Sequence, residues 1–302
     1  MPACARVWRR RCGGCTSAWL SRRTGSTSSP RLHDRLRATH NVSPIVDEYG
    51  DAQCLCGVHG DRWSCFVEGG RGTVEITVGP AESMFELGTI MQPVLSALQE
   101  VLEAEGAALL GYGIQPRTRP DRSTILPRSR YYALADALGD EAFSGWSVTA
   151  ADQAHVAVDD GEVATVVNAL HGATPFVIAL TANSSVFGDR QSAFASGREH
   201  LMGRTGADRY GMTPKPLNGL EDYVDHLLDQ TVMFLRDAGG RPHAFGRQSL
   251  AELLASRPDL EPAALLDDQD HYCWASARPR RRFSTVESSA CPCWRSAAAA
   301  RS

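Results

Sequence analysis

The stretch Val67–Pro80 decides the fold and reads VEGGRGTVEITVGP. Within it, polar and apolar residues alternate strictly over Thr73–Val78, which predicts a strand with one buried face. The polar face of this strand carries Glu75, and Glu68 stands just before the glycine-rich turn that precedes the strand. Two interpretations are open at this point. The carboxylates belong either to a solvated sheet face or to a surface that holds metal ions.

The size and charge of the chain narrow the classes of protein to consider. With 302 residues and 43% hydrophobic content, the chain is long enough for one large domain or two modest ones. We find no apolar run that approaches the length of a membrane span, so no membrane association is expected. The net charge of −4 hides basic ends and a strongly acidic centre. An acidic folded part argues against a nucleic-acid partner.

The two ends of the chain differ in composition from its centre. The first 30 residues are rich in Arg and Ser and nearly free of acids, which is typical of a mitochondrial-type transit peptide. Alternatively, both ends are out-of-frame translation of a gene rich in G and C, because Lys215 is the only lysine against thirty arginines. We therefore predict a disordered or non-native segment over 1–45, a folded domain over 46–290 and an irregular tail over 291–302. The nine cysteines, an odd count, argue against a secreted disulfide framework and favour a cytoplasmic location.

Periodicity places the remaining elements. The patterns predict an α+β chain with a mainly antiparallel sheet, because strands and long helices do not alternate regularly. Neither a phosphate loop of the GxxxxGK[ST] type nor a GxGxxG turn is present. The predicted elements are a helix over 82–105 kinked at Pro93, a strand over 107–115, a helix over 129–138, a strand over 146–158, two largely buried helices over 162–170 and 175–181, an amphipathic helix over 220–237 and a short helix over 249–255.

Five segments in order along the chain carry a resemblance to a known family. They are EGGRGTVEITVGP (68–80) with LLGYGIQP (109–116), PRSRY (127–131), TAADQAHV (149–156), ALTANSS with Gly188 and Ser196-Gly197-Arg198 (179–198), and Asp270-His271 with Arg278-Pro279-Arg280 and Thr285-Val286-Glu287. Together they resemble the glutamate–cysteine ligase type 2 family, also called carboxylate–amine ligases. The resemblance covers roughly residues 46–290 and makes this region a ligase-type catalytic domain.

The resemblance implies a fold and a reaction. The fold is a curved, mainly antiparallel sheet that forms an open funnel with helices on its outer face, like the glutamine synthetase catalytic domain. The reaction uses ATP to phosphorylate the γ-carboxylate of glutamate, after which the amine of cysteine attacks the acyl phosphate. The product, γ-glutamylcysteine, serves thiol biosynthesis. ATP and Mg²⁺ are the implied cofactors and small molecules the implied partners, while the oligomeric state stays unknown.

The resemblance also assigns candidate residues. Magnesium neutralises polyphosphate charge through oxygen ligands, and planar arginines suit carboxylates and phosphoryl groups. The alternatives are solvated carboxylates, surface arginines and structural polar residues, and Asn183 in particular suits a turn at a helix end. The candidates are Glu68, Glu75 and Glu287 for metal binding, Arg198, Arg130 and Arg280 for catalysis, and Gln153, His155, Tyr131 and Asn183 for substrate or nucleotide binding.

Two departures from the family pattern mean that the family's fold and the family's activity are separate expectations for this chain. The family begins with a Gly-x-Glu-x-Glu strand that supplies metal ligands, and no such pair precedes Val46. The family also has Arg two residues after its last glutamate, where this chain has Ser289. We expect an open sheet edge and missing ligands. These departures keep two alternatives open, namely an impaired homologue that retains the fold and a ligase for a different acid and amine.

Overall fold

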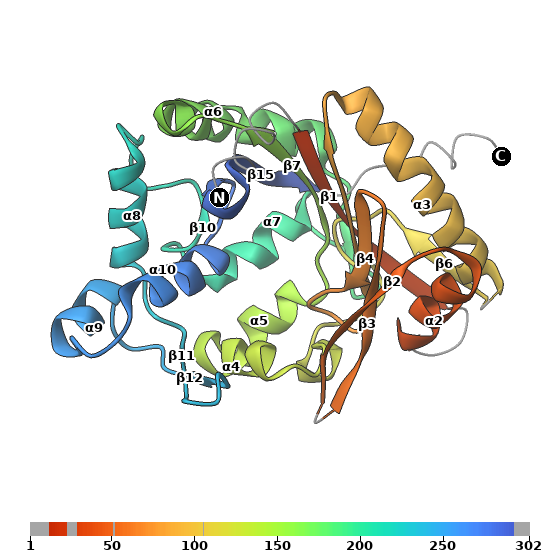
Figure 1. Ribbon diagram of the computed structural model, residues 1–302, viewed down its shortest axis with the longest axis horizontal. Helices are drawn as coiled ribbons and strands as arrows, with labels where there is room; N and C mark the ends of the chain where they lie inside the picture. Colours follow the sequence, from red (N-terminus) through yellow and green to blue (C-terminus); the bar gives the residue numbers. More distant parts are fainter. Residues whose placement is uncertain (1–11, 23–28, 51, 105, 293–302) are drawn as a thin grey trace.

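The structure is a computed structural model that describes residues 12–22, 29–50, 52–104 and 106–292. A nine-stranded sheet runs through the molecule (Figure 1), and every pair of neighbouring strands in it is antiparallel. The prediction of a mixed chain with a mainly antiparallel sheet is therefore confirmed. The strands, in spatial order, are β14 (Ala277–Arg280), β15 (Thr285–Pro292), β7 (Ala151–Ala157), β1 (Cys12–Arg22), β5 (Thr73–Ala81), β4 (Trp63–Val67), β3 (Ala52–Gly60) and β2 (Ser43–Tyr49), with β6 (Ala107–Leu110) also paired to β1.

The strand β1 lies in the centre of this sheet, between β5 and β7. Its register sets Ser17 opposite Glu75 and Cys15 opposite Gln153. The prediction of disorder over 1–45 is therefore wrong for β1 and for helix α2 (Ser29–Thr39). In the described sheet β1 occupies the edges of β5 and β7 that were expected to be open. It can do so without a Glu-x-Glu motif because the pairing uses backbone groups. The sequence of β1 contains neither Asp nor Glu.

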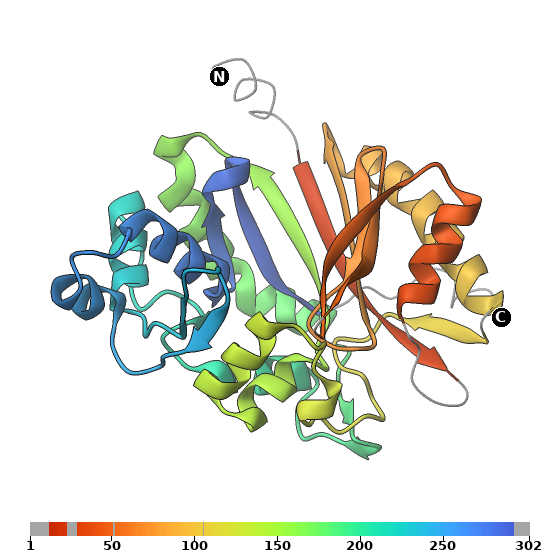
Figure 2. The same ribbon diagram turned by 60° about the horizontal axis from the view of Figure 1, so that its bottom comes forward.

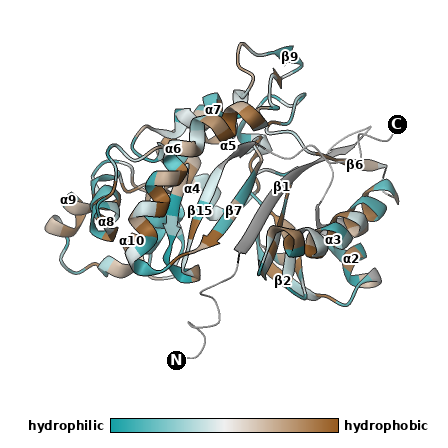
Figure 3. Cartoon of the chain, turned by 90° about the horizontal axis from the view of Figure 1, so that it is seen from above, coloured by the Kyte–Doolittle hydropathy of each residue, from teal (hydrophilic) through white to brown (hydrophobic). Residues whose placement is uncertain are grey.

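Helices cover both halves of the sheet. Figures 2 and 3 show α2 and α3 beside the β1–β5 half, and α6, α8 and α10 beyond the β7–β15 half. The helices are α3 (Met84–Ala104), α4 (Ser129–Leu138), α5 (Asp140–Trp146), α6 (Val163–Thr181), α7 (Gly197–Met202), α8 (Leu220–Asp229), α9 (Leu250–Ser256) and α10 (Pro262–His271). Short strand pairs complete the chain: β8 (Val186–Phe187) with β9 (Arg190–Gln191), β10 (Tyr210–Gly211) with β13 (Trp274–Ala275), and β11 (Phe234–Arg236) with β12 (Pro242–Ala244).

The two faces of β5 divide as its alternation predicts. Val74, Ile76 and Val78 are buried in one apolar cluster. The same cluster includes Leu98 and Leu102 of α3, which share one side of that helix. The strand predicted over Thr73–Val78 is confirmed and runs on to Ala81. Its polar residues consequently face away from α3.

Several predicted element boundaries are wrong. The strand predicted over 146–158 begins only at Ala151, because Trp146 ends α5. The strand predicted over 107–115 ends at Leu110. The helix predicted over 220–237 ends at Asp229, where the side chain of Gln269 donates to the Gln230 carbonyl at 3.1 Å and the chain turns into β11. Residues 291–292 end β15 instead of starting an irregular tail, and 293–302 lie outside the described residues.

Helix α6 differs most from its prediction. Two largely buried helices were expected over 162–170 and 175–181, yet one helix continues through Pro175. It is not largely buried, since Phe176 and Leu180 are exposed. By length and composition, residues 160–181 also match a membrane span, which corrects the expectation that no such run exists. A single helix of this kind is weak evidence for a membrane, because core helices pass the same test.

The glycine turn before β5 is packed against the loop after α5. Gly69 has φ +55°, a conformation that favours glycine, and it sits against the Trp146 ring. A Cβ built on Gly70 would lie 1.9 Å from the Ser147 carbonyl oxygen. Both glycines thus let the turn lie close against Trp146 and Ser147, and this packing fixes the position of Glu68 and of the start of β5.

We predict that Gly70→Ala lowers the free energy of unfolding by roughly 2–3 kcal/mol, because backbone must move to admit the methyl group. Urea denaturation followed by circular dichroism measures this. The matched control is Gly88→Ala in α3, where an added Cβ meets nothing within 4 Å. This control should gain about 0.5–1 kcal/mol from helix propensity. Equal effects of the two substitutions would contradict the close approach.

Candidate active site

A cavity of about 410 Å³ opens on the face of the sheet opposite α3. Alternate residues of the strands form its floor, since side chains two apart share a face. The floor consists of Thr73, Glu75 and Thr77 of β5, Ala151, Gln153 and His155 of β7, Arg278 and Arg280 of β14, and Glu287 and Ser289 of β15. The face sharing predicted for Gln153 and His155 is confirmed.

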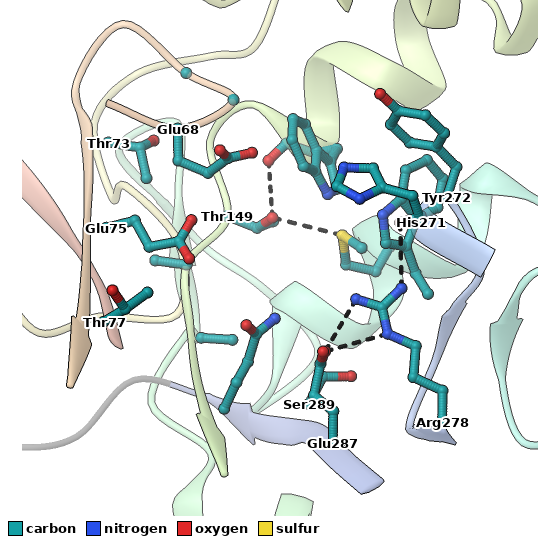
Figure 4. A pocket seen from close by; sticks show the side chains of 18 of the residues that line it. Glu68, Thr73, Glu75, Thr77, Thr149, His271, Tyr272, Arg278, Glu287 and Ser289 are labelled. Atoms are coloured by element: carbon teal, nitrogen blue, oxygen red, sulfur yellow. Dashed lines mark hydrogen bonds and ion pairs between the residues drawn. The ribbon is translucent and has the colours of Figure 1, made fainter. Parts of the chain in front are cut away.

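Two carboxylates form one side of the cavity. Glu68, from the glycine turn, and Glu75, from β5, both point into the open space (Figure 4). Glu68 accepts a hydrogen bond from the Tyr131 hydroxyl at 2.9 Å. Burial, reinforced by Glu68, raises the pKa of Tyr131, so its hydroxyl keeps the proton that it donates. The tyrosine therefore orients one of the two carboxylates.

Arg130 lies beside this carboxylate pair. Its guanidinium carbon stands 4.9 Å from the centre of the Tyr131 ring, and its Nη2 donates to the Tyr131 hydroxyl at 3.2 Å. Its Nε is buried and has no hydrogen-bond partner among the described residues. A buried donor without a partner costs free energy unless a ligand accepts from it. Arg130 is thus suited to an anionic ligand in the cavity.

The opposite side of the cavity is organised around Glu287, which is 2% exposed. One carboxylate oxygen accepts from Arg278 Nε at 3.2 Å and Nη2 at 3.0 Å, and the other lies 3.2 Å from Arg280 Nε. Burial alone would raise the pKa of Glu287, but Arg278 and Arg280 outweigh burial and lower it. Figure 4 shows Arg278 and Glu287 across the cavity from Glu68 and Glu75.

Two histidines stay neutral next to these arginines. The pKa of His155 is lowered by burial and by Arg280 and Arg278, although Glu287 opposes the shift from 3.7 Å. Burial, with the same arginines, lowers the pKa of His271 to about 3. Each imidazole is therefore available as a neutral donor or acceptor.

Arg198 reaches the cavity from α7 and is 5% exposed. Its Nη1 lies 2.5 Å from Glu199 Oε1, and the hydroxyl of Tyr210 donates to the other oxygen of Glu199. The backbone N–H of Arg198 donates to the Ser184 hydroxyl at 3.1 Å. These contacts at the amino end of the short helix α7 thus hold the direction of this guanidinium.

The structure brings nine of the ten predicted site residues together around the cavity. The exception is Asn183, whose side chain bonds the Gly113 N–H at 2.9 Å and the Gly111 carbonyl at 3.0 Å. These contacts agree with the alternative of a turn after a helix, and the assignment of Asn183 to substrate or nucleotide binding stays a prediction. The prediction missed the lining residues Arg278, His271, Tyr210, Trp146 and Trp274. Arg278 had a usable signal, because it stands two residues before Arg280 and shares its face.

The carboxylates of the cavity meet the requirements of magnesium in part. No group of three His, Cys, Asp or Glu side chains capable of holding a metal occurs in the described part of the chain. Mg²⁺ in nucleotide sites takes one or two protein carboxylates and fills its shell with phosphate oxygens and water. Glu68 and Glu75 fit this requirement. Arginines engage both oxygens of Glu287 in the described structure, and its assignment as a metal ligand stays a prediction.

Comparison with known proteins agrees with this geometry. The model of the family described as "Glutamate-cysteine ligase family 2" matches residues 37–299. The chain belongs to this family. A chloroplastic glutamate–cysteine ligase of Arabidopsis thaliana is 27% identical over 187 residues, which cover 60% of this chain and 36% of that protein. A putative glutamate–cysteine ligase 2-2 of a Mycobacterium species (strain KMS) is 32% identical over 136 residues, covering 43% of this chain and 35% of that protein.

A solved structure supports the fold of this family member. The glutamate–cysteine ligase of Francisella tularensis in complex with AMP superimposes with a TM-score of 0.52 and 10% sequence identity. The superposition covers 92% of this chain and 60% of that one. The matched regions thus span little more than a third of the two curated relatives and about three fifths of the solved chain.

We predict that His271 makes the stability of the protein depend on pH below neutrality. Its pKa is about 3 in the folded chain and 6.5 in the reference state, so the unfolded chain binds the extra proton between these values. The contribution of His271 to the free energy of unfolding is therefore complete above pH 6.5. It is lost as pH falls from 6.5 toward 3, by up to about 1.4 kcal/mol per pH unit. Urea denaturation between pH 7 and pH 5 measures the slope.

The variant His271→Gln should flatten this slope. The matched control is His243→Gln on β12, where the side chain is 60% exposed. It should leave the slope as in the wild type. An unchanged slope in His271→Gln would show that His271 is protonated in the folded chain at these pH values.

Proposed function

We propose that the chain is an ATP-dependent carboxylate–amine ligase that joins the γ-carboxylate of glutamate to the amine of cysteine. The observation that carries the proposal is one cavity with a carboxylate side, Glu68 and Glu75, facing an arginine side, Arg278 and Arg280. Such a cavity suits a reaction that brings a nucleotide with its cation and an amino-acid carboxylate to one point. Membership of the ligase family and the AMP bound by the Francisella relative support it.

In the proposed reaction, an oxygen of the γ-carboxylate attacks the γ-phosphorus of ATP and ADP leaves. The nitrogen of cysteine then attacks the acyl carbon, phosphate leaves and the proton of the nitrogen passes to solvent. Glu68 and Glu75 would hold Mg²⁺, which supplies charge neutralisation for the phosphates when it is bound. Arg130, Arg198 and Arg280 would orient the carboxylate and stabilise the charge of the phosphoryl group.

The remaining predicted residues would position the substrates. Gln153 is placed on β7 with neutral His155, and both can donate or accept hydrogen bonds at the floor of the cavity. Tyr131 would keep Glu68 directed toward the cation through its hydrogen bond. In this proposal no protein nucleophile is required, because positioning and electrostatics supply the catalysis.

A second candidate is a nucleotide-binding homologue without ligase activity. Ser289, where the family has Arg, lines the cavity, so the substitution removes a charge from the site itself. The sequence of β1 also lacks the carboxylates that the family resemblance leads us to expect. The two candidates differ in turnover and share nucleotide binding.

We expect the purified chain to release ADP only when Mg²⁺, ATP, an acid and an amine are all present. The assay omits each component in turn, with glutamate and cysteine as the first pair, and mass spectrometry identifies γ-glutamylcysteine. Chelation of Mg²⁺ should abolish release. A thermal shift by Mg-ATP without turnover on any acid and amine would favour the second candidate.

We further expect Glu75→Gln to lower kcat/KM roughly 100-fold or more, because the amide keeps the shape of the side chain but loses its charge. The matched control is Glu100→Gln, which makes the same change at an exposed position of α3 and should keep full activity. Thermal melting checks that both variants fold. Full activity in a folded Glu75→Gln would remove Glu75 from the proposed site.

A further inference from the structure

Two arginines of the cavity lining each contact a carboxylate that lies outside the lining. Arg198 Nη1 lies 2.5 Å from Glu199 Oε1, and Arg280 Nη1 lies 3.7 Å from Asp270 Oδ2. Arg198 and Arg280 line the cavity, whereas neither Glu199 nor Asp270 is among the described residues of that lining. Both carboxylates therefore reach the arginines from outside the cavity.

A tyrosine hydroxyl orients each of these carboxylates. The Tyr210 hydroxyl donates to Glu199 Oε2, and the Tyr223 hydroxyl donates to Asp270 Oδ1 at 2.8 Å. Burial raises the pKa of both tyrosines, and the neighbouring carboxylates raise it further, so each hydroxyl keeps the proton that it donates. In both groups one carboxylate oxygen therefore contacts the tyrosine and the other contacts the arginine.

This arrangement does not follow from local helix geometry. Arg198 and Glu199 are neighbours in α7, and the side chains of neighbouring helical residues point about 100° apart. Their contact needs the carboxylate to be held toward the guanidinium, and the hydroxyl of Tyr210 on β10 holds it there from a different element. In the second group the tyrosine comes from α8, the carboxylate from α10 and the arginine from β14. The same combination thus occurs twice, built from different elements.

We propose that Glu199 and Asp270 are positioning residues for the ligase reaction, an inference that rests on the proposed function of the cavity. Each carboxylate, oriented by its tyrosine, holds one guanidinium in place before a substrate binds. An arginine side chain has several rotatable bonds, so immobilising it during binding would cost free energy that a guanidinium held in advance does not lose. At Arg280, Nη1 has no hydrogen-bond partner among the described residues and can donate to a substrate anion.

The two groups should differ in strength. The contact of Glu199 with Arg198 is shorter than that of Asp270 with Arg280, and Coulomb attraction falls with distance. Arg280 has a second carboxylate, because its Nε lies 3.2 Å from Glu287. The loss of Asp270 should therefore disturb its arginine less than the loss of Glu199 disturbs Arg198.

Double-mutant cycles on the purified chain test the proposal. Glu199→Gln should lower kcat/KM about 10- to 100-fold and Asp270→Asn about three- to tenfold, because a misplaced guanidinium stabilises the charge of the reaction less well. With Arg198→Ala already present, Glu199→Gln should cause no further loss, and the same should hold for Asp270→Asn with Arg280→Ala. A merely structural role would lower the melting temperature and leave the effects on kcat/KM additive.

Two control variants make the same chemical changes at ion pairs outside the cavity. Glu141→Gln removes the charge that contacts Arg204 at 2.6 Å, and the Glu141 side chain is 84% exposed. Asp267→Asn, on the helix that carries Asp270, removes the charge that contacts Arg281 at 2.6 Å. Both variants should keep the kcat/KM of the wild type.

A more distant variant tests the role of the tyrosines. Tyr223 lies in an apolar cluster and is not among the described residues of the cavity lining, so Tyr223→Phe removes only the hydroxyl that orients Asp270. This variant should lower kcat/KM about three- to tenfold, the range for the net loss of one hydrogen bond. Combined with Asp270→Asn it should cause no further loss, because both changes act through the same carboxylate.

The same cycles can be measured on binding, by isothermal titration of Mg-ATP and of glutamate, so the test does not depend on turnover. Non-additive losses of affinity in a chain without turnover would contradict the proposed function and support the positioning role. Additive losses in both readouts would overturn the positioning role. A folded Glu199→Gln with the kcat/KM and the affinities of the wild type would overturn it as well.

Discussion

The arrangement of the cavity depends on one buried carboxylate. Glu287 of β15 is paired in register with His155 of β7 on one side and with Arg278 of β14 on the other. Its carboxylate therefore lies between these two residues in the sheet. Removing one partner of a buried, hydrogen-bonded charge pair costs about 3–5 kcal/mol, because the other charge is left without compensation. The Arg278 guanidinium also donates to the backbone carbonyls of Asp270 and His271 at 3.3 Å. The contacts of Glu287 and Arg278 therefore join β7, β14 and β15 to the carboxyl end of α10.

This ion pair also determines which charges remain for a ligand. Glu287 compensates the arginines of β14, whereas Arg130 keeps a buried Nε without a partner in the described part of the chain. On the same side as Arg130, Glu68 accepts from the Tyr131 hydroxyl and Glu75 points into the open space. The side of the cavity with Glu68 and Glu75 thus combines carboxylates suited to a cation with Arg130, a donor suited to an anion. Each antiparallel strand contributes residues of only one face to this lining.

The sequence predicts the site better than it predicts the elements around it. Short-range alternation identified β5 and the shared face of Gln153 and His155, because a period of two is a local property. Glu287 was predicted as a residue of the cavity, but its ion pairs with Arg278 and Arg280 were not, because these partners come from a different strand. Helix α5 was not predicted at all, and the end of α8 was misplaced because tertiary contacts such as that of Gln269 with Gln230 decide it. The strand β1 was missed because its sequence carries no regular alternation, and its place is set by the edges of β5 and β7.

The position of β1 has a consequence for the order in which the chain folds. β5 and β7 do not pair with each other in the described sheet, so β1 alone joins β5, β4, β3 and β2 to β7, β15 and β14. Its partners lie some 60 and 140 residues further along the chain. A contact of such separation closes a long loop, which slows folding relative to local pairing. The strand β1 can therefore complete its hydrogen bonds only after β7 has been synthesised, and the two halves of the sheet under the cavity are not joined until it does.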